Sequence, residues 1–174
     1  MNIRMLSVAI SLLTAALPAS AIEGESSTIN FTGNITEATC ALTTGGGPLS
    51  VVLGDVAANT LKQAGLYSTA NDFTIGLEDC DVSVANQASV TFSGDTASDT
   101  ALKTRAGAMA ASGVGIQILQ NGQPLILDGS TASAEVALTT GSNSLPFSAR
   151  YIALDENVTA GRADATANFT MNYQ

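Results

Sequence analysis

The chain ends on a segment in which every second residue is apolar. The apolar positions alternate with polar ones and are Ala163, Ala165, Ala167, Phe169, Met171 and Tyr173. A period of two predicts a β-strand with one buried face, and here it runs to the penultimate residue with no turn behind it. A strand edge must pair with a neighbour or be protected from aggregation. The pattern therefore raises the question of what lies beside this strand.

The preceding sequence consists of short β-rich runs separated by Gly, Asn, Asp and Ser. We predict strands at 27–36, 48–54, 72–80, 88–94, 113–120, 123–128, 134–140 and 144–154. The stretch 56–70 is less regular and could hold a helical turn, and 101–111 is interpreted as an irregular loop. Many short strands at regular spacing predict a β-sandwich. With no repeat, linker or composition break, one all-β domain is expected.

The first 21 residues have the layout of a secretory signal peptide. Arg4 gives a basic start, an apolar run extends from Leu6 to Leu17, and small residues lead to Ala21. The apolar run is shorter than the roughly 20 residues of a membrane span. We expect cleavage after Ala21, so that the mature chain begins at Ile22, is exported and has no membrane span.

Composition narrows the possible partners. Without Arg4 the mature chain has 5 basic and 15 acidic side chains, a net charge of −10. This argues against nucleic acid, whose binding depends on Lys and Arg neutralising phosphates, and against anionic lipid surfaces. Only 12% of residues are charged and 45% are hydrophobic, which argues against disorder.

Two cysteines, Cys40 and Cys80, remain in a protein expected to be exported. An even count in an oxidising compartment predicts one disulfide. The alternative is a pair of free buried thiols. A structural zinc site would need more Cys or His ligands than the chain has.

The absence of histidine removes several kinds of chemistry. A Ser-His-Asp or Cys-His nucleophile cannot be built, and first-row metals lose their commonest ligand. Glu78, Asp79 and Asp81 lie together near Cys80, but they have none of the spacing of a calcium loop and are interpreted as a solvated turn. We expect no catalytic residues, no metal and no cofactor.

Three features taken together resemble one family, the type 1 fimbrial major subunits of the chaperone–usher pathway. One is the pair of cysteines within ATCAL and LEDCDVSVA. Another is the block NSLPFSARYIAL at 143–154. The third is a C-terminal signature with Gly161 fourteenth from the end, alternating apolar residues and a penultimate Tyr173. The ordered set covers essentially the whole mature chain.

The resemblance implies an incomplete immunoglobulin-like β-sandwich that lacks its final strand and is completed by a donor strand from another subunit. In the family, a periplasmic chaperone supplies this strand during export, and the N-terminal extension of the next subunit supplies it in the fibre after passage through an outer-membrane usher. The implied organisation is a signal peptide at 1–21, a donor-strand extension at 22–38 and a pilin domain at 39–174. The implied location is a fimbrium at the cell surface.

The resemblance also assigns residues to the joint. Gly33 fits the glycine of the family's donor strand, Ile35 would occupy the subsite first invaded, and Ser27 departs from the pattern because a larger apolar residue would fill its end of the groove. The expected donor residues are Ser27, Ile29, Phe31, Gly33 and Ile35. The expected acceptor groove and chaperone-binding strand comprises Gly161, Ala163, Ala165, Ala167, Phe169, Met171, Tyr173 and Gln174.

The preferred prediction is the repeating shaft subunit of an adhesive fimbria, and other readings stay open. The alternative closest to this prediction is a minor or adaptor subunit of the same organelle. A free-standing secreted binding module, such as a lectin-like sandwich, is another, although the chain has no Trp and only three Tyr to stack on sugars. In that case 22–35 would be an ordinary first strand of its own domain. Insertion of the extension into its own domain is a further alternative.

Overall fold

The computed structural model describes residues 27–32 and 39–174. The predicted signal peptide, Gly33 and Ile35 lie outside the described residues. Residues 27–32 form neither helix nor strand, and the side chains of Ile29 and Phe31 are 75% and 90% exposed. A strand was predicted over 27–36, but none forms in the described part of it, because a strand requires a neighbour with which to pair.

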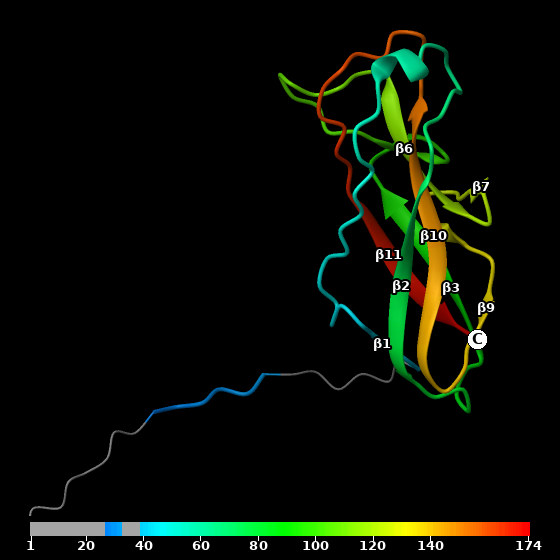
Figure 1. Cartoon of the computed structure of the whole chain (residues 1–174). Coiled ribbons are helices and arrows are strands. Elements are labelled where there is room, and N and C mark those ends of the chain that lie inside the picture. Colours follow the sequence, from blue (N-terminus) through cyan, green and yellow to red (C-terminus); the bar gives the residue numbers. More distant parts are fainter. Residues whose placement is uncertain (1–26, 33–38) are drawn as a thin grey trace, which may run out of the picture. The chain divides into compact units, whose positions relative to one another are not determined.

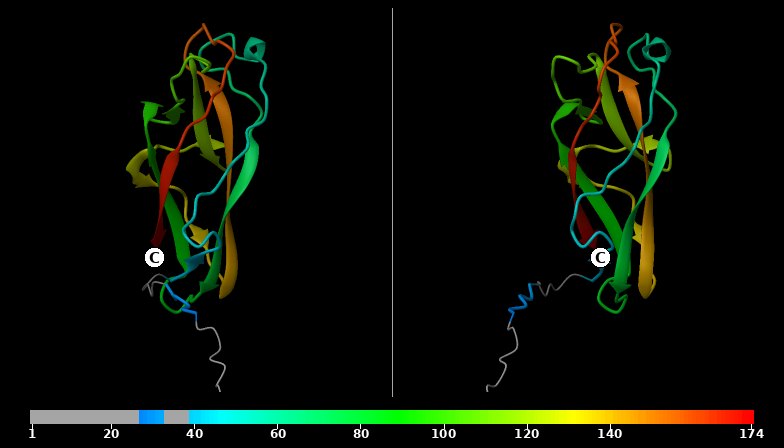
Figure 2. Two further views of the ribbon diagram at one scale, coloured as in Figure 1. Left: turned by 90° about the vertical axis from the view of Figure 1, so that its left-hand side faces the viewer. Right: turned by 60° about the vertical axis from the view of Figure 1, so that its left-hand side comes forward.

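Residues 39–174 fold into two antiparallel β-sheets, seen as two layers in Figures 1 and 2. In the first sheet the order is β1 (Ala41–Leu42), β2 (Asn71–Cys80), β10 (Gly141–Ala153), β6 (Val114–Gln120), β5 (Ala101–Lys103) and β4 (Thr96–Ser98), and β7 (Gln123–Pro124) pairs with β6. In the second sheet the order is β11 (Ala167–Tyr173), β3 (Gln87–Gly94) and β8 (Asp128–Ala132), and β9 (Val136–Ala137) pairs with β3. This arrangement is the expected all-β, immunoglobulin-like sandwich.

The core lies between the two sheets. Leu77 from β2, Val90 from β3 and Leu145 from β10 are fully buried. The rings of Phe92 and Phe147 meet edge to face across the layers, with their centroids 5.2 Å apart, an arrangement that aromatic pairs prefer. At the β1 end of the sandwich, Cys40 and Cys80 form the predicted disulfide. The alternating apolar residues of the long strands therefore account for the core.

The strand predictions succeed where a neighbour is available. Those at 72–80, 88–94, 113–120 and 144–154 correspond to β2, β3, β6 and β10, and the helical turn predicted within 56–70 is the short 3₁₀ helix η1 (Ala58–Thr60). The predicted strand at 48–54 is wrong, since this segment pairs with no other strand. The runs 123–128 and 134–140 form only the short strands β7, β8 and β9, and the predicted loop at 101–111 begins with β5. The final strand starts at Ala167 rather than Ala163.

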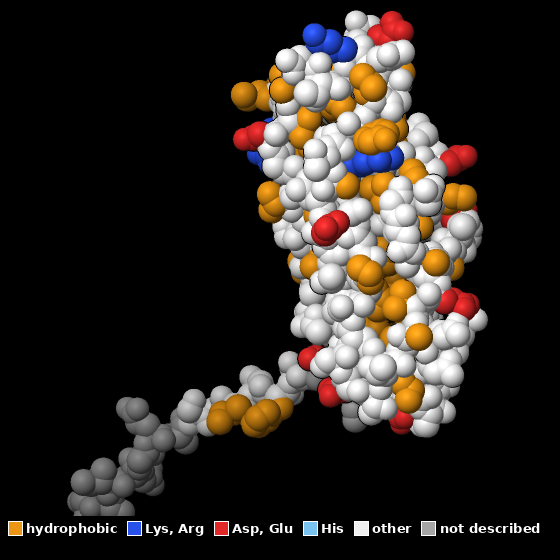
Figure 3. Space-filling view, turned by 45° about the vertical axis from the view of Figure 1, so that its right-hand side comes forward, with side chains coloured by type: hydrophobic (Ala, Val, Ile, Leu, Met, Phe, Trp, Pro, Cys, Tyr) orange, Lys and Arg blue, Asp and Glu red, His pale blue; other side chains and the backbone are white. Residues whose placement is uncertain are grey.

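The surface carries few charges. Figure 3 shows a face on which most atoms are white, the colour of the backbone and of the remaining side chains, with small groups of hydrophobic side chains and few charged ones. This agrees with a sequence in which 12% of residues are charged. Among the described residues, no helix is long and apolar enough to cross a membrane.

Candidate functional site

An apolar groove runs along the side of the sandwich next to β11. It consists of two cavities of about 610 Å³ and 700 Å³, which we call the upper and the lower cavity. Both are lined by Val51, Leu53, Ile116 and Ala165, so they are parts of one continuous depression. We refer to it as the edge groove.

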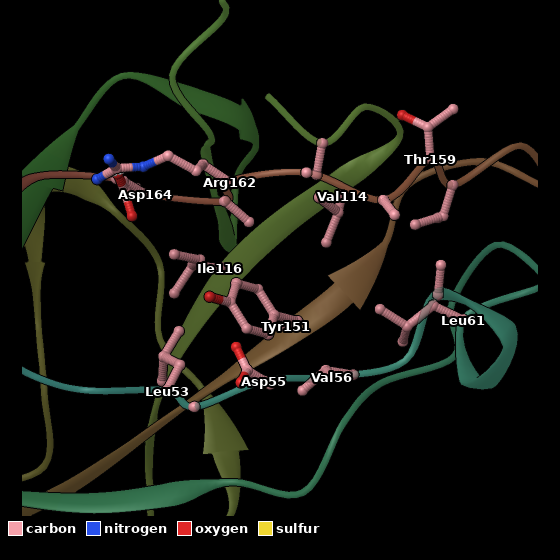
Figure 4. Close-up of a pocket in the computed structure, with 18 of the residues that line it drawn as sticks. Leu53, Asp55, Val56, Leu61, Val114, Ile116, Tyr151, Thr159, Arg162 and Asp164 are labelled. Atoms are coloured by element: carbon pink, nitrogen blue, oxygen red, sulfur yellow. Dashed lines mark hydrogen bonds and ion pairs between the residues drawn. The ribbon is translucent and has the colours of Figure 1, made fainter. Parts of the chain in front are cut away.

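Two segments far apart in the sequence form the walls of the edge groove. One wall is the segment 46–58, which passes over the sandwich without joining a sheet, and the other is 158–169, which leads into β11. The floor of the upper cavity comes from β6 and β10, as Figure 4 shows with Val114, Ile116 and Tyr151 between the two walls. The floor of the lower cavity includes the aromatic rings of Phe73 and Phe92. The groove is therefore a slot that opens onto the core.

The backbone of β11 is unpaired on the side that faces the groove. Gln174 exchanges two backbone hydrogen bonds with Gln87, each at 3.0 Å. The antiparallel register then pairs Tyr173 with Ala88 and continues up to Ala167 with Gly94. Because hydrogen-bonded and non-hydrogen-bonded pairs alternate, the odd-numbered residues of β11 turn their N–H and C=O groups away from β3. Within the described chain β11 pairs only with β3. These groups therefore form an open edge.

The segment before β11 continues the same alternation. The N–H of Arg162 donates to the carbonyl of Met109 at 2.9 Å, and the carbonyls of Arg162 and Asp164 accept from Ala111 and Arg105, each at 2.8 Å. In the described chain, the backbone groups of the intervening Ala163 and Ala165 have no such partner. From Ala163 to Tyr173, every odd-numbered residue thus turns its side chain toward the core and its backbone toward the open edge.

The opposite wall lacks backbone partners as well. Between residues 48 and 56 no backbone–backbone hydrogen bond is found within the described chain. A single contact from a side chain is present, in which the Asn71 amide donates to the carbonyl of Leu53 at 3.1 Å. Val51 and Leu53 are half-buried, while Val52 between them is 80% exposed. This wall is an extended segment with an inward face and no strand beside it.

The centre of the upper cavity is polar as well as apolar. In Figure 4 the Tyr151 ring stands between the walls, with Asp55 on one side and Arg162 and Asp164 on the other. Arg162 and Asp164 form an ion pair at 2.7 Å. Burial raises the pKa of the Tyr151 hydroxyl, and the carboxylates of Asp164 and Asp55 raise it further. Tyr151 therefore stays neutral and able to donate a hydrogen bond at physiological pH.

The predicted acceptor residues fall into two groups. Gly161, Ala163, Ala165, Ala167 and Phe169 all line the edge groove. The remaining three residues of the prediction, Met171, Tyr173 and Gln174, lie beyond its lower end.

These last three residues close the sandwich rather than line the groove. Met171 and Tyr173 are half-buried against the core. The Tyr173 hydroxyl lies 3.5 Å from the carbonyl of Cys40, and burial raises its pKa. Gln174 is exposed, and its terminal oxygen accepts from the N–H groups of Asn86 and Gln87.

Gly161 has a steric reason for lacking a side chain. A Cβ at this position would lie 2.5 Å from both the Ala110 carbonyl carbon and the Ala111 nitrogen, and 2.7 Å from the Met109 carbonyl oxygen. All three are backbone atoms that cannot turn aside as a side chain would. Glycine thus allows the strand to approach the 109–111 backbone closely.

Sequence reasoning missed the second wall and the floor. The segment 48–54 was predicted as a strand but not as part of a site, and its run of Val51, Val52 and Leu53 is apolar throughout, so the sequence does not indicate which side chains face inward. Ile116 and Tyr151 were expected only as parts of ordinary strands. The disulfide of Cys40 and Cys80 does not line either cavity. Ser27, Ile29 and Phe31 belong to a part of the chain that is described separately from the sandwich.

Comparison with known proteins gives a consistent result. The sequence model of the family "Fimbrial protein" matches residues 29–174. The chain is 44% identical over 152 residues to the type-1 fimbrial protein A chain of Escherichia coli, covering 84% of this chain and 82% of that protein. It is 41% identical over 171 residues to the type 1 fimbrial subunit of Klebsiella pneumoniae, covering 95% and 93%.

Solved structures show the same likeness. The P pilus rod subunit PapA superposes with a TM-score of 0.67 at 25% identity, over 79% of this chain and all of that one. A subunit in the structure of a chaperone–usher pilus superposes with a TM-score of 0.71 at 25% identity, over 90% of this chain and all of that one.

Proposed function

The chain belongs to the fimbrial protein family and is a structural subunit of a chaperone–usher fimbria rather than an enzyme, and from this premise we propose that it is the major shaft subunit, polymerised by donor-strand exchange. The edge groove receives the N-terminal extension of the next subunit. A head-to-tail contact that does not close on itself generates an open filament. The similarity to a rod subunit and to type-1 fimbrial A chains supports the shaft role.

The open backbone on both walls of the groove is the observation that carries this proposal. An extended strand placed in the groove would pair with the odd-numbered residues from Ala163 onward on one side and with the wall 48–56 on the other. Its apolar side chains would enter the two cavities. Addition of a strand to an exposed edge draws its affinity from backbone hydrogen bonds and its specificity from the pockets.

A count of positions gives the register of the donor strand. The odd-numbered residues of the acceptor segment that line the groove are Thr159 and the five from Gly161 to Phe169, and we match the five alternate residues of the extension to these last five. Set antiparallel, they pair large with small side chains, as Ile35 with Gly161, Gly33 with Ala163, Phe31 with Ala165, Ile29 with Ala167 and Ser27 with Phe169. The parallel direction would place Ile35 against Phe169 and leave Ser27 against Gly161. The small side chain of Ser27 thus suits the end of the groove that Phe169 already fills.

Under the same proposal the chain is divided into three parts. Residues 1–21 are the signal peptide, 22–38 the donor-strand extension and 39–174 the pilin domain. Each large apolar donor side chain that enters the groove contributes roughly 1.5–3 kcal/mol. Because the donor completes a folding core, its departure requires the sandwich to open, and the joint is held by a large kinetic barrier.

Export requires protection of the open edge, and we assign this role to a periplasmic chaperone that occupies the groove before an outer-membrane usher delivers the subunit to the surface. The free main-chain groups of β11 and the exposed Gln174 carboxylate are the features that such a chaperone would engage. Of these, Met171, Tyr173 and Gln174 lie beyond the end of the strand that the donor segment reaches.

The first test of the proposal is the oligomeric state of the mature protein on a denaturing gel, unheated and boiled. We expect a ladder that collapses on boiling and that is absent when residues 22–35 are deleted. A monomer band that depends on the same segment for folding would instead mean that the extension completes its own domain. Copy number in a surface preparation separates a shaft subunit from an adaptor, because only the former dominates.

The register is tested with paired cysteines. Thr28 and Asn168 face each other as a non-hydrogen-bonded pair, whose Cα atoms lie about 4.5 Å apart, within the range of a disulfide. Fibres carrying Thr28→Cys with Asn168→Cys should give a boiling-resistant ladder that collapses on reduction. The pair Thr28→Cys with Thr170→Cys is the control, and preferential cross-linking there would mean a register shifted by two residues.

A further inference from the structure

We infer that residues 105–112 are a positioning segment, which holds the upper half of the acceptor strand, residues 159–166, in its extended conformation before the donor strand arrives. Arg105 fixes the point at which this half joins β11. The inference rests on the proposed function, since it concerns the readiness of the same groove. It adds a part of the chain that neither lines the lower cavity nor touches the donor side of the strand.

The sheet itself cannot hold this half of the strand. The pairing of β11 with β3 ends where Ala167 faces Gly94. Above that point the second sheet contributes no further neighbour among the described residues. On its inner side the segment borders the upper cavity, and only the small side chain of Ala163 packs against the cluster of Leu61, Val114 and Ala153 there.

The segment 105–112 hydrogen-bonds to the acceptor strand beyond the point where the pairing with β3 ends. Backbone hydrogen bonds join Arg105 to Asp164, and Arg162 to both Met109 and Ala111. The N–H of Thr159 also donates to the carbonyl of Ser112 at 3.1 Å. These bonds extend from one end of 159–166 almost to the other.

Side chains secure both ends of this contact. At the far end the N–H of Ser112 donates to the Thr159 hydroxyl at 3.0 Å, and the two hydroxyls lie 2.8 Å apart. At the β11 end the Arg105 guanidinium donates to the Thr166 hydroxyl at 2.6 Å. Between them Gly161 lies directly against the backbone of 109–111. The contact is therefore fixed at three points along eight residues.

The pattern of bonds leaves the donor side free. The residues of the strand that bond to 105–112 are even-numbered, or lie at its very start, whereas the donor strand needs Ala163 and Ala165. The positioning segment thus bonds to the backbone groups that the donor strand does not use, and does not compete with it for them, although Ala111 itself lines the upper cavity. It supports the end at which Ile35 would enter first.

The experiment compares donor capture by four subunits purified with their chaperone, which are the unaltered chain, Arg105→Ala, Thr166→Val and the double variant. The probe is a synthetic peptide of residues 22–39. Loss of a hydrogen bond from a charged donor should slow capture at least about fivefold in each single variant. The double variant should be no slower than either single one, because both remove the same contact.

Two controls distinguish an effect on the position of residues 159–166 from a general loss of stability of the subunit. Lys103→Ala removes a nearby exposed basic side chain and should capture at the unaltered rate. Arg105→Lys keeps a donor and should recover part of the rate. Dissociation of the captured peptide should change less than twofold in all variants, because a seated donor strand itself holds 159–166 in place.

Three results would overturn the inference. They are capture by Arg105→Ala at the unaltered rate, additive losses in the double variant, and dissociation accelerated as much as capture is slowed. Failure of the unaltered subunit to capture the peptide would count against donor-strand exchange itself. The two proposals are thereby tested separately.

Discussion

The two halves of the acceptor strand are held in different ways. The lower half, β11, is bonded along its length to β3, and its side chains pack onto the core near the disulfide of Cys40 and Cys80. Among the described residues, the backbone of the upper half, 159–166, is bonded only to 105–112, and this half borders a cavity of about 610 Å³. One half has a strand of its own sheet on one side, whereas the other is held without one, and both leave the backbone groups of their opposite side to a strand that the domain does not contain.

This difference teaches how an incomplete fold can persist. Stability need not be uniform across a structure, and the elements that take part in binding are drawn from its less stable regions. Here the long strands and the disulfide supply the stability, and the upper half is the less supported part of an open edge that continues along β11. Changes in the lower half should therefore affect folding, whereas changes in the upper half should affect assembly.

The largest effect is expected in the lower half, from Cys80→Ser. The bridge joins residues 40 positions apart, and on the chain-entropy model its loss costs on the order of 4 kcal/mol, a large share of the stability of a typical domain. Denaturant unfolding and the yield of chaperone-bound subunit measure this cost. Unchanged yield and stability would show that the lower half does not depend on the bridge.

The next effect concerns Gly161 in the upper half. Gly161→Ala places a Cβ against the backbone of 109–111, and such overpacking typically costs about 1–3 kcal/mol. We expect slower polymerisation of the purified subunit. Gly107→Ala is a matched control in the same loop, since a Cβ there meets nothing within 4 Å. Equal behaviour of the two variants would contradict the close-approach argument.

A smaller effect tests the opposite wall. Val51→Asp places a charge on the inward face of the groove, whereas Val52→Asp changes an outward side chain that is 80% exposed. The first should weaken donor binding by roughly 1.5–3 kcal/mol, the contribution of one buried apolar side chain, and the second should leave it unchanged. The temperature at which the oligomer ladder dissociates distinguishes them. A matching loss for Val52→Asp would show that this wall faces the other way.

The smallest effect is a dependence on alkaline pH. Burial raises the pKa of Tyr151 and Tyr173 above the ordinary 10.0. A raised pKa in the folded state contributes stability that is present below the unfolded value and is lost as pH rises through the folded one. Unfolding midpoints should therefore fall above pH 10, and less so in Tyr151→Phe. A midpoint independent of pH in that range would argue against the burial of these hydroxyls.

Much of the fold could be predicted because the period of two is strong in the long strands. The alternation at 72–80 and 144–154 identifies which side chains face the core, and both segments find neighbours within the chain. The final segment was predicted as one strand from Ala163, and the structure divides it at Ala167. Alternation specifies an extended chain with two faces, but it does not specify whether a partner is present.

The same limit explains what was missed in the site. The apolar run within 48–54 predicted a strand, yet the segment pairs with nothing in the described chain, and only the structure shows that Val51 and Leu53 face inward. The role of 105–112 could not be predicted, because its contacts with 159–166 are mostly backbone bonds between segments with no shared pattern. The run at 123–128 is paired only at its two ends, by Gln123–Pro124 in β7 and by Asp128, which begins β8 and whose carboxylate accepts from the N–H groups of Ser130 and Thr131.

The alternation of side chains along β11 also separates two kinds of evolutionary constraint. Odd-numbered residues meet the core and the groove, and the even-numbered Asn168 and Thr170 point outward and are exposed. A substitution at an outward position leaves the joint between subunits unaltered. The outer surface of a fibre can therefore change in sequence, one residue at a time, while the residues that join one subunit to the next stay the same.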